Sequence, residues 1–209
     1  LLFQGFIGWF MVKSGLVNTP DISHFRLALH LSIAFIIILI VFKSLLLRLY
    51  PVQIGPYRGA FFVGLGLFFL TFFQVIIGAF VSGMKAGFGF NTWPLMGSTW
   101  IPDHLFFMAP IYRNFIHNGF AIQFLHRHLG ELIFVCVVCF SCYLWKVKDF
   151  SFRFFFPSLV LVFIQFLLGV FTLIFHVPLV LASLHQVNAI FLLCAFVYYL
   201  HFLSIKNEV

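Results

Sequence analysis

Two long stretches of this chain contain no charged side chain. Residues 59–84 form the first and residues 154–205 the second. The hydrocarbon core of a bilayer is crossed by about 20 consecutive apolar residues in a helix, so the first stretch is long enough for one span and the second for two. Because the whole chain is 63% hydrophobic and only 8% charged, it cannot cover a water-exposed surface with polar groups. The sequence therefore predicts an integral membrane protein.

The apolar segments predict an all-α fold, a polytopic membrane helix bundle. Proline lacks an amide hydrogen and clashes with the preceding helical turn, so we place a break in the last apolar stretch at His176-Val177-Pro178. Residues 1–12 are too short for a complete span and are interpreted as the tail of one. We expect five full transmembrane helices plus one partial helix, with the full ones at about 24–48, 59–84 and 119–145 and two within 154–205.

The chain begins at Leu1, inside an apolar run, and no charged segment with a cleavage site precedes that run. This pattern is not that of a signal peptide. We expect the chain to be an N-terminally truncated fragment of a longer protein.

Lysine and arginine favour one orientation in the membrane, because cytoplasmic loops carry an excess of both. One set of span ends carries more of them than the other: Lys43, Arg48, Arg58, Lys146, Lys148, Arg153 and Lys206 against Lys13, Arg26, Lys85, Arg113 and Arg127. This difference predicts a cytoplasmic C-terminus and an outward-facing loop 85–118, whose Gly, Trp, Pro and Asn residues suggest a lid over the bundle. The net charge of +7 favours contact with anionic membrane lipid, and the scattered basic residues argue against nucleic acid.

A Gln-x-x-x-Gly-x-Phe pattern occurs three times, at residues 4–10, 74–80 and 165–171. Glutamine and glycine four residues apart share a helix face, where glycine allows close approach and glutamine can hydrogen-bond across helices. Each copy precedes a span that runs the opposite way and carries a histidine, namely His30, His126 or His185. The repeating unit is therefore predicted to be a helix pair.

The three histidines lie at one predicted depth, one to two turns inside the outer ends of their spans. An imidazole in hydrocarbon is costly unless it has a partner, and neutral imidazole is a common ligand of haem iron. We expect His126 and His185 to bind one haem iron from opposite faces, with Arg127 beside the haem propionates. Gly130 and Ala189, one turn below, are expected to leave room for a flat macrocycle. The alternative is two unrelated polar residues, each satisfied by hydrogen bonds within the bundle.

His30 repeats this arrangement, with Arg26 one turn above it and Ala34 one turn below. It is therefore predicted to be half of a second haem site.

The remaining candidate ligands are interpreted as structural. His128 lies on a different helix face from His126, and Glu131 can pair with either Arg127 or His128. The cysteines are interpreted as small hydrophobes within spans. The other histidines are assigned to interfacial or structural positions: His24, His104, His117, His176 and His201.

Several ordered motifs resemble those of one family, the haem A synthases of the type found in mitochondria and alphaproteobacteria. Each motif is weak alone, but their order and spacing are specific, and the resemblance spans essentially the whole chain. The motifs are GWFMVKSGL at residues 8–16, FRLALHL at 25–31, NTWPLM at 91–96, WIP at 100–102, QFLHR at 123–127 and HQ at 185–186.

The resemblance implies an eight-helix, pseudo-symmetric protein of two four-helix halves. Residues 1–50 would be the remnant of the N-terminal half, and residues 51–209 the haem-binding C-terminal half. The family oxidises a methyl group of haem O to a formyl group, making haem A for terminal oxidases. By resemblance, His126 and His185 would ligate a haem b cofactor, and His30, with Arg26 nearby, would bind the substrate haem.

The same resemblance implies a bacterial inner membrane or the mitochondrial inner membrane, with the haem sites toward the outer side. An electron donor and the haem O-producing enzyme are the expected partners.

The chain departs from the family pattern in lacking the first two helices, which carry a Glu-x-x-His motif whose glutamate is implicated in catalysis. In the half that is present, the position three before His126 is Gln123, and a neutral amide cannot accept a proton as a carboxylate can. The full-length parent is therefore expected to be an active haem A synthase and this piece alone to be inactive.

The alternative function is a b-type membrane cytochrome that passes electrons through a bis-histidine haem. A transporter is disfavoured, because no broken-helix ion site is apparent in the sequence.

Overall fold

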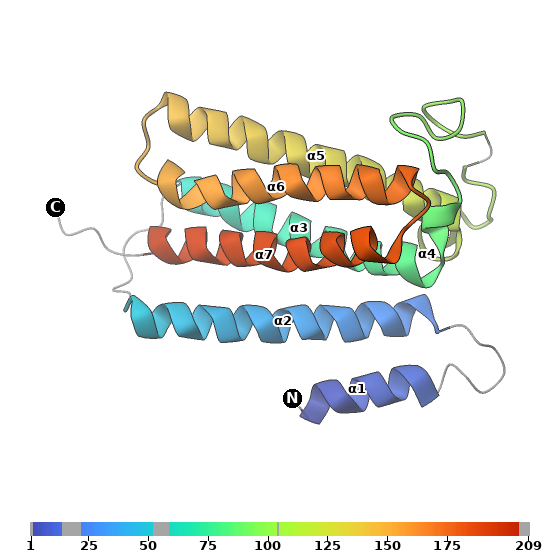
Figure 1. Cartoon of the computed structure of the whole chain (residues 1–209), viewed down its shortest axis with the longest axis horizontal. Helices are drawn as coiled ribbons and strands as arrows, with labels where there is room; N and C mark the ends of the chain where they lie inside the picture. The colour runs from blue at the N-terminus through green and yellow to red at the C-terminus, as the bar shows by residue number, and fades with distance from the viewer. Residues whose placement is uncertain (1, 14–21, 52–58, 104, 205–209) are drawn as a thin grey trace.

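The computed structural model describes residues 2–13, 22–51, 59–103 and 105–204, and in them the chain is all-α (Figure 1). Among the predicted features, Arg58, His104 and Lys206 lie outside the described residues. A short first helix is followed by five long apolar ones: α1 Leu2–Lys13, α2 His24–Leu49, α3 Gly59–Gly83, α5 Gly119–Lys146, α6 Phe152–Ile174 and α7 Leu179–Leu203.

The five long helices have 23 to 28 residues each. At about 1.5 Å of rise per residue, even the shortest exceeds the roughly 30 Å thickness of a bilayer core. All five are long and apolar enough to cross a membrane, whereas α1 has only 12 residues. The prediction of five helices long enough to cross a membrane is confirmed in the described residues, and the chain is a multi-pass membrane protein.

The ends of the helices follow local chemistry. The Asn118 side chain accepts hydrogen bonds from the backbone nitrogens of Phe120 and Ala121, which have no partner within α5. The predicted break before Pro178 is confirmed: α6 ends at Ile174, and both His176 and Val177 adopt left-handed backbone conformations. The Val177 nitrogen then donates to the Thr172 carbonyl oxygen at 2.8 Å, closing the last turn.

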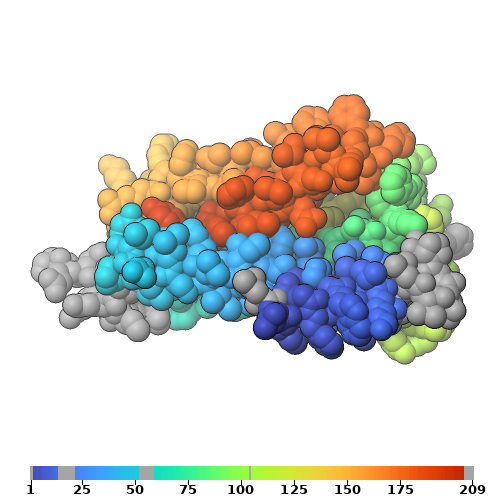
Figure 2. All heavy atoms as spheres, turned by 60° about the horizontal axis from the view of Figure 1, so that its bottom comes forward, coloured from blue at the N-terminus to red at the C-terminus, as the bar shows by residue number. Residues whose placement is uncertain are grey.

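Helices α3, α5, α6 and α7 form a four-helix bundle in which α5 and α7 lie on one diagonal and α3 and α6 on the other. Helix α2 packs against α3 and α7, and α1 packs against α2. In the space-filling view α1 covers only part of the length of α2 (Figure 2). The main core cluster joins the four bundle helices and includes Leu67, Val137, Leu144, Phe155, Phe196 and Tyr199.

The loop between α3 and α5 lies at the end of the bundle where α3 ends and α5 begins, here called the loop end (Figure 1). It contains two short 3₁₀ turns, η1 Ala86–Phe88 and η2 Ile111–Arg113, and the one-turn helix α4 Asn114–His117. Buried Asn114 and Asn118 tie its second half together, because Asn118 Nδ2 donates to the Leu105 carbonyl oxygen and to Asn114 Oδ1. The loop is therefore a fixed structure at the end where all three repeat histidines lie.

Candidate functional site

The repeated glutamine marks a hydrogen bond between the two helices of each predicted pair. In all three pairs the glutamine Nε2 donates to the backbone carbonyl oxygen of the histidine on the next long helix. The distances are 3.0 Å for Gln4–His30, 2.7 Å for Gln74–His126 and 3.1 Å for Gln165–His185. The sequence repeat is thus a repeated contact, joining α1 to α2, α3 to α5 and α6 to α7.

The repeated glycine makes room for the imidazole of the same histidine. A Cβ atom built on Gly8, Gly78 or Gly169 would lie 3.0 Å from the Cε1 atom of His30, His126 or His185 respectively. That separation is tighter than ordinary van der Waals contact. Any larger residue at these positions would therefore push the ring away.

His126 and His185 face each other across the bundle. They come from the diagonally opposed helices α5 and α7, and their ring centroids lie 6.5 Å apart with an interplanar angle of 72°. A metal–imidazole bond is about 2 Å long, so two rings that bind one ion from opposite sides have centroids roughly 6 to 6.5 Å apart. The observed separation of 6.5 Å lies at the upper end of this range, so the gap between the two rings is wide enough for one metal ion.

Several polar atoms at this site are buried and have no hydrogen-bond partner among the described residues. They include Nδ1 of His126, Nη1 of Arg127 and Oε1 of Gln74. Buried polar groups are normally paired. The His126 nitrogen belongs to an imidazole that faces the His185 ring. The Arg127 nitrogen is an N–H donor suited to a carboxylate. The donor set therefore fits a haem with propionate groups.

The His185 residue has more polar contacts than His126, because Gln165 contacts both its backbone and its ring. Gln165 Nε2 lies 3.2 Å from each ring nitrogen of His185, in addition to its bond to the backbone. Gln165 Oε1 in turn accepts a hydrogen bond of 2.7 Å from Asn188 Nδ2. Asn188 is buried and also donates to the Leu161 carbonyl oxygen. The sequence interpretation missed Asn188, although its position one turn after His185 on the same helix face could have suggested it.

Arg127 and Gln123 hold the loop against α5. Arg127 Nη2 donates to the carbonyl oxygens of Thr92, Pro94 and Leu95 at 2.9, 3.1 and 3.1 Å. Gln123 bonds to Phe90 in both directions: its Nε2 donates to the carbonyl oxygen and its Oε1 accepts from the backbone nitrogen. Gln123 thus anchors the loop at Phe90.

We expect Arg127→Leu to loosen the loop. A hydrogen bond to a charged group contributes about 1.5 to 3 kcal/mol, so the Phe90, Met96 and Gly97 amides should exchange with deuterium at least about tenfold faster. The measurement is hydrogen exchange followed by mass spectrometry on peptides from residues 88–99. Arg113→Leu, in an exposed turn of the same loop, is the matched control and should leave their exchange unchanged. Equal exchange in both variants would contradict the assigned anchor.

The two small residues expected beside a macrocycle pack against protein instead. A Cβ on Gly130 would lie 3.1 Å from Gln74 Nε2, so this glycine makes room for the glutamine of the α3 repeat. Ala189 is buried in a cluster with Phe35, Leu39 and Leu193, which joins α7 to α2. That part of the prediction was wrong, because the rotation of α5 and α7 turns these positions toward neighbouring helices.

His30 and Arg26 lie in α2, outside the four-helix bundle. The His30 ring nitrogens are 3.2 and 3.4 Å from Gln4 Nε2, as in the His185 unit. The Arg26 guanidinium carbon lies 5.3 Å from the centroid of the Phe10 ring on α1. The geometry of His30 thus repeats that of His185.

The remaining histidines of the described residues have other surroundings. His201 is fully buried at the opposite end of the bundle, where Lys43 Nζ donates to its Nδ1 and its Nε2 donates to the Tyr50 carbonyl oxygen. His128 Nδ1 lies 2.9 Å from Glu131 Oε2. Of the two partners considered for Glu131, Arg127 and His128, the structure therefore shows a hydrogen bond with His128. His24 packs against the His117 ring at a centroid distance of 5.8 Å.

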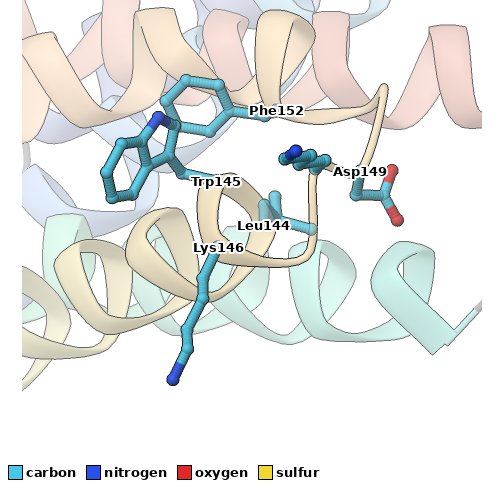
Figure 3. A pocket seen from close by; sticks show the side chains of 6 residues that line it. Leu144, Trp145, Lys146, Asp149 and Phe152 are labelled. Carbon is cyan, nitrogen blue, oxygen red and sulfur yellow. The ribbon is translucent and has the colours of Figure 1, made fainter.

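A surface hollow lies at the turn between α5 and α6, lined by Leu144, Trp145, Lys146, Lys148, Asp149 and Phe152 (Figure 3). Along α5, Leu144 is 18 residues beyond His126, or about 27 Å. The hollow is therefore at the far end of the bundle and is not part of the candidate site.

The fold and these contacts define a multi-pass membrane protein built from histidine-bearing helix pairs. The chain belongs to the COX15-CtaA family, described as cytochrome oxidase assembly protein, whose family model matches residues 1–197. The resemblance to the haem A synthase family is thereby confirmed.

Curated relatives named "Heme A synthase" are similar over nearly the whole chain. The relative from Wolbachia pipientis wMel is 39% identical over 208 residues, covering 96% of this chain and 57% of the relative. The relative from Flavobacterium johnsoniae is 41% identical over 213 residues, covering 97% and 61%. The relative from Rickettsia felis is 38% identical over 205 residues, covering 92% and 59%. The chain thus spans about three fifths of the length of these relatives.

Proposed function

We propose that this chain is the larger part of a haem A synthase, an oxidoreductase that converts a methyl group of haem O to a formyl group to give haem A for terminal oxidases. The observation that carries the proposal is the opposition of His126 and His185 at a centroid distance of 6.5 Å. The family match and the relatives named for this activity support it.

In this proposal His126 and His185 would hold a haem b cofactor by binding its iron through their imidazoles. Arg127 supplies its free Nη1 donor to a propionate while Nη2 keeps the loop in place. Gly78 on α3 and Gly169 on α6 lie beside the two histidine rings, and neither residue has a Cβ atom that would reduce the space between the helices. When bound, such a haem supplies one-electron transfer. The side chains of His126, His185 and Arg127 would position the haem, and Arg127 holds the loop over the site.

His30 and Arg26 are proposed to belong to the substrate site for haem O. Residues 1–50 would then be the remaining part of an N-terminal four-helix half, and residues 51–209 the C-terminal half of an eight-helix, pseudo-symmetric protein. The matching contacts of Gln4 with His30 and of Gln165 with His185 support this pseudo-symmetry. A second haem ligand and a catalytic glutamate would come from the part that the relatives have beyond this chain.

The proposed location is a bacterial inner membrane or the mitochondrial inner membrane, with both haem sites toward the outer side and the C-terminus inside. The excess of Lys and Arg at the opposite span ends supports this orientation. An electron donor and the enzyme that makes haem O are the proposed partners.

The alternative function is a b-type cytochrome that passes electrons without changing its haem. Gln123 favours it for this half, since both ends of the Gln123 amide are engaged in holding the loop and neither can act as a base. The two functions differ in whether haem O is consumed.

The proposal is tested by extracting pigment from membranes supplied with haem O. We compare this chain alone with a chimera that adds the segments the Wolbachia relative has beyond the matched part. We expect haem A only with the chimera and a bis-histidine haem b with both. Haem A from the chain alone would contradict the need for the added segments. A chimera that binds haem b, incorporates haem O and forms no haem A would favour the cytochrome.

A further inference from the structure

We propose that Gln165, fixed by Asn188, is a positioning residue that sets the direction and plane of the His185 imidazole. This inference rests on the proposed function, in which His185 would bind the iron of haem b. The ligands of bound metals are commonly oriented by such outer partners. It differs from the role of a general helix-to-helix contact, because it assigns to Gln165 an effect on the haem itself.

The first step is the bond from Gln165 Nε2 to the His185 carbonyl oxygen, at 3.1 Å. This carbonyl belongs to the same residue as the imidazole. Anchoring it from α6 fixes the rotation of α7 about its own axis at this depth, and therefore the direction in which the imidazole leaves the helix. A bond to any other residue of α7 would constrain this direction less directly.

The second step concerns the plane of the ring. The Gln165 amide nitrogen lies 3.2 Å from both Nδ1 and Nε2 of His185. The backbone of Gly169, one turn along the same α6 face, lies beside Cε1, where even a Cβ would come within 3.0 Å. The imidazole is therefore confined by two groups of α6, and its rotation about the Cβ–Cγ bond is restricted.

The third step is the role of Asn188, which settles the orientation of the Gln165 amide. Asn188 Nδ2 can only donate, so the Gln165 atom that accepts its 2.7 Å bond must be the oxygen. The Gln165 nitrogen is then necessarily the atom that faces His185. Asn188 is buried and is held by its second bond to the Leu161 carbonyl oxygen.

The recurrence of this contact supports a role specific to the histidines. Glutamine donates to the histidine carbonyl in all three helix pairs, at 3.1 Å or less. A contact that only joined helices would not need to select, in α2, α5 and α7 alike, the carbonyl oxygen of the repeat histidine.

The test uses haem b binding, the midpoint potential and the electron paramagnetic resonance spectrum of the ferric protein, whose anisotropy reports the angle between the two imidazole planes. We expect Gln165→Leu to weaken haem b binding about 10- to 100-fold and to change both the potential and the anisotropy. Asn188→Ala should change the same three quantities in the same direction and by less. Because Asn188 acts through Gln165, the double variant should resemble Gln165→Leu alone.

Gln186→Leu is the matched control, since it makes the same chemical change one residue from His185 at an exposed position. It should leave all three quantities unchanged. If Gln165→Leu proves unstable, Asn188→Ala decides the question, because it leaves Gln165 and His185 in place. If haem b binding depends on His185 but neither Gln165→Leu nor Asn188→Ala changes potential or anisotropy, this inference fails and the proposed function stands. If binding does not depend on His126 and His185, the proposed function fails.

Discussion

His126→Ala and His185→Ala are each expected to abolish the low-spin haem b spectrum of the purified protein. Each substitution removes one of two rings that face each other at a centroid distance of 6.5 Å, so the remaining imidazole can hold iron from one face only. No other described histidine has its ring in this gap, so no other imidazole could replace the lost one. The measurement is the reduced-minus-oxidised difference spectrum, together with the haem content per protein.

His128→Ala is the matched control for this experiment. It removes an imidazole two residues from His126 on the same helix, and the structure pairs that imidazole with Glu131 rather than with the site. Its spectrum and haem content should match those of the unaltered protein. A low-spin spectrum that survives in both ligand variants would show that these histidines do not bind the haem.

The spans and the helix pairs could be predicted from sequence because both depend on information local to one segment. An uncharged stretch such as residues 59–84 has one stable arrangement in a bilayer, a helix that satisfies its own backbone. The Gln-x-x-x-Gly spacing places both residues on one helix face whatever the helix packs against. The structure confirms that these faces meet the histidines, through Gln74 and Gly78 at His126 for example.

The surroundings of the histidines could not be predicted as fully, because they depend on how each helix is rotated relative to its neighbours. Gly130 and Ala189 lie one turn from the histidines, yet they face Gln74 and α2. Arg127 contacts three carbonyl oxygens of a loop more than 30 residues earlier. Neither the direction of a helix face nor a contact between a side chain and distant backbone is encoded in spacing along one segment.

The helix pairs that carry His126 and His185 differ in a way that the sequence repeat does not reveal. Gln165 contacts both the backbone and the ring of His185, whereas the hydrogen bond of Gln74 goes to the His126 carbonyl oxygen and leaves His126 Nδ1 without a partner among the described residues. Asn188 follows His185 by three residues, whereas Leu129 stands at the same place after His126. Ile33 stands there after His30, whose ring Gln4 also contacts, so this position does not by itself account for the difference. His185 is the more constrained of the two opposed histidines.

Gly78→Leu is expected to remove haem b as completely as the loss of His126. The Cβ atom alone would lie 3.0 Å from His126 Cε1, and the further atoms of leucine would occupy the position of the ring. Overpacking of this kind costs about 1 to 3 kcal/mol, which displacement of the imidazole relieves. Gly78→Ala should give partial loss, because a shift of a few tenths of an ångström accommodates one carbon atom. Haem content and the low-spin spectrum are measured across the series.

Gly66→Leu provides the comparison that separates this steric effect from a general effect of leucine in α3. Gly66 lies in the same helix, and a Cβ there would meet nothing within 4 Å. Leucine at that exposed position adds helix propensity and apolar surface, so haem binding should persist and thermal stability should not fall. Loss of haem in both leucine variants, or in neither, would contradict the assignment of Gly78 as the space for the His126 ring. Loss in Gly78→Leu alone, with α-helical content intact, would link one glycine of the repeat directly to the position of a ligand.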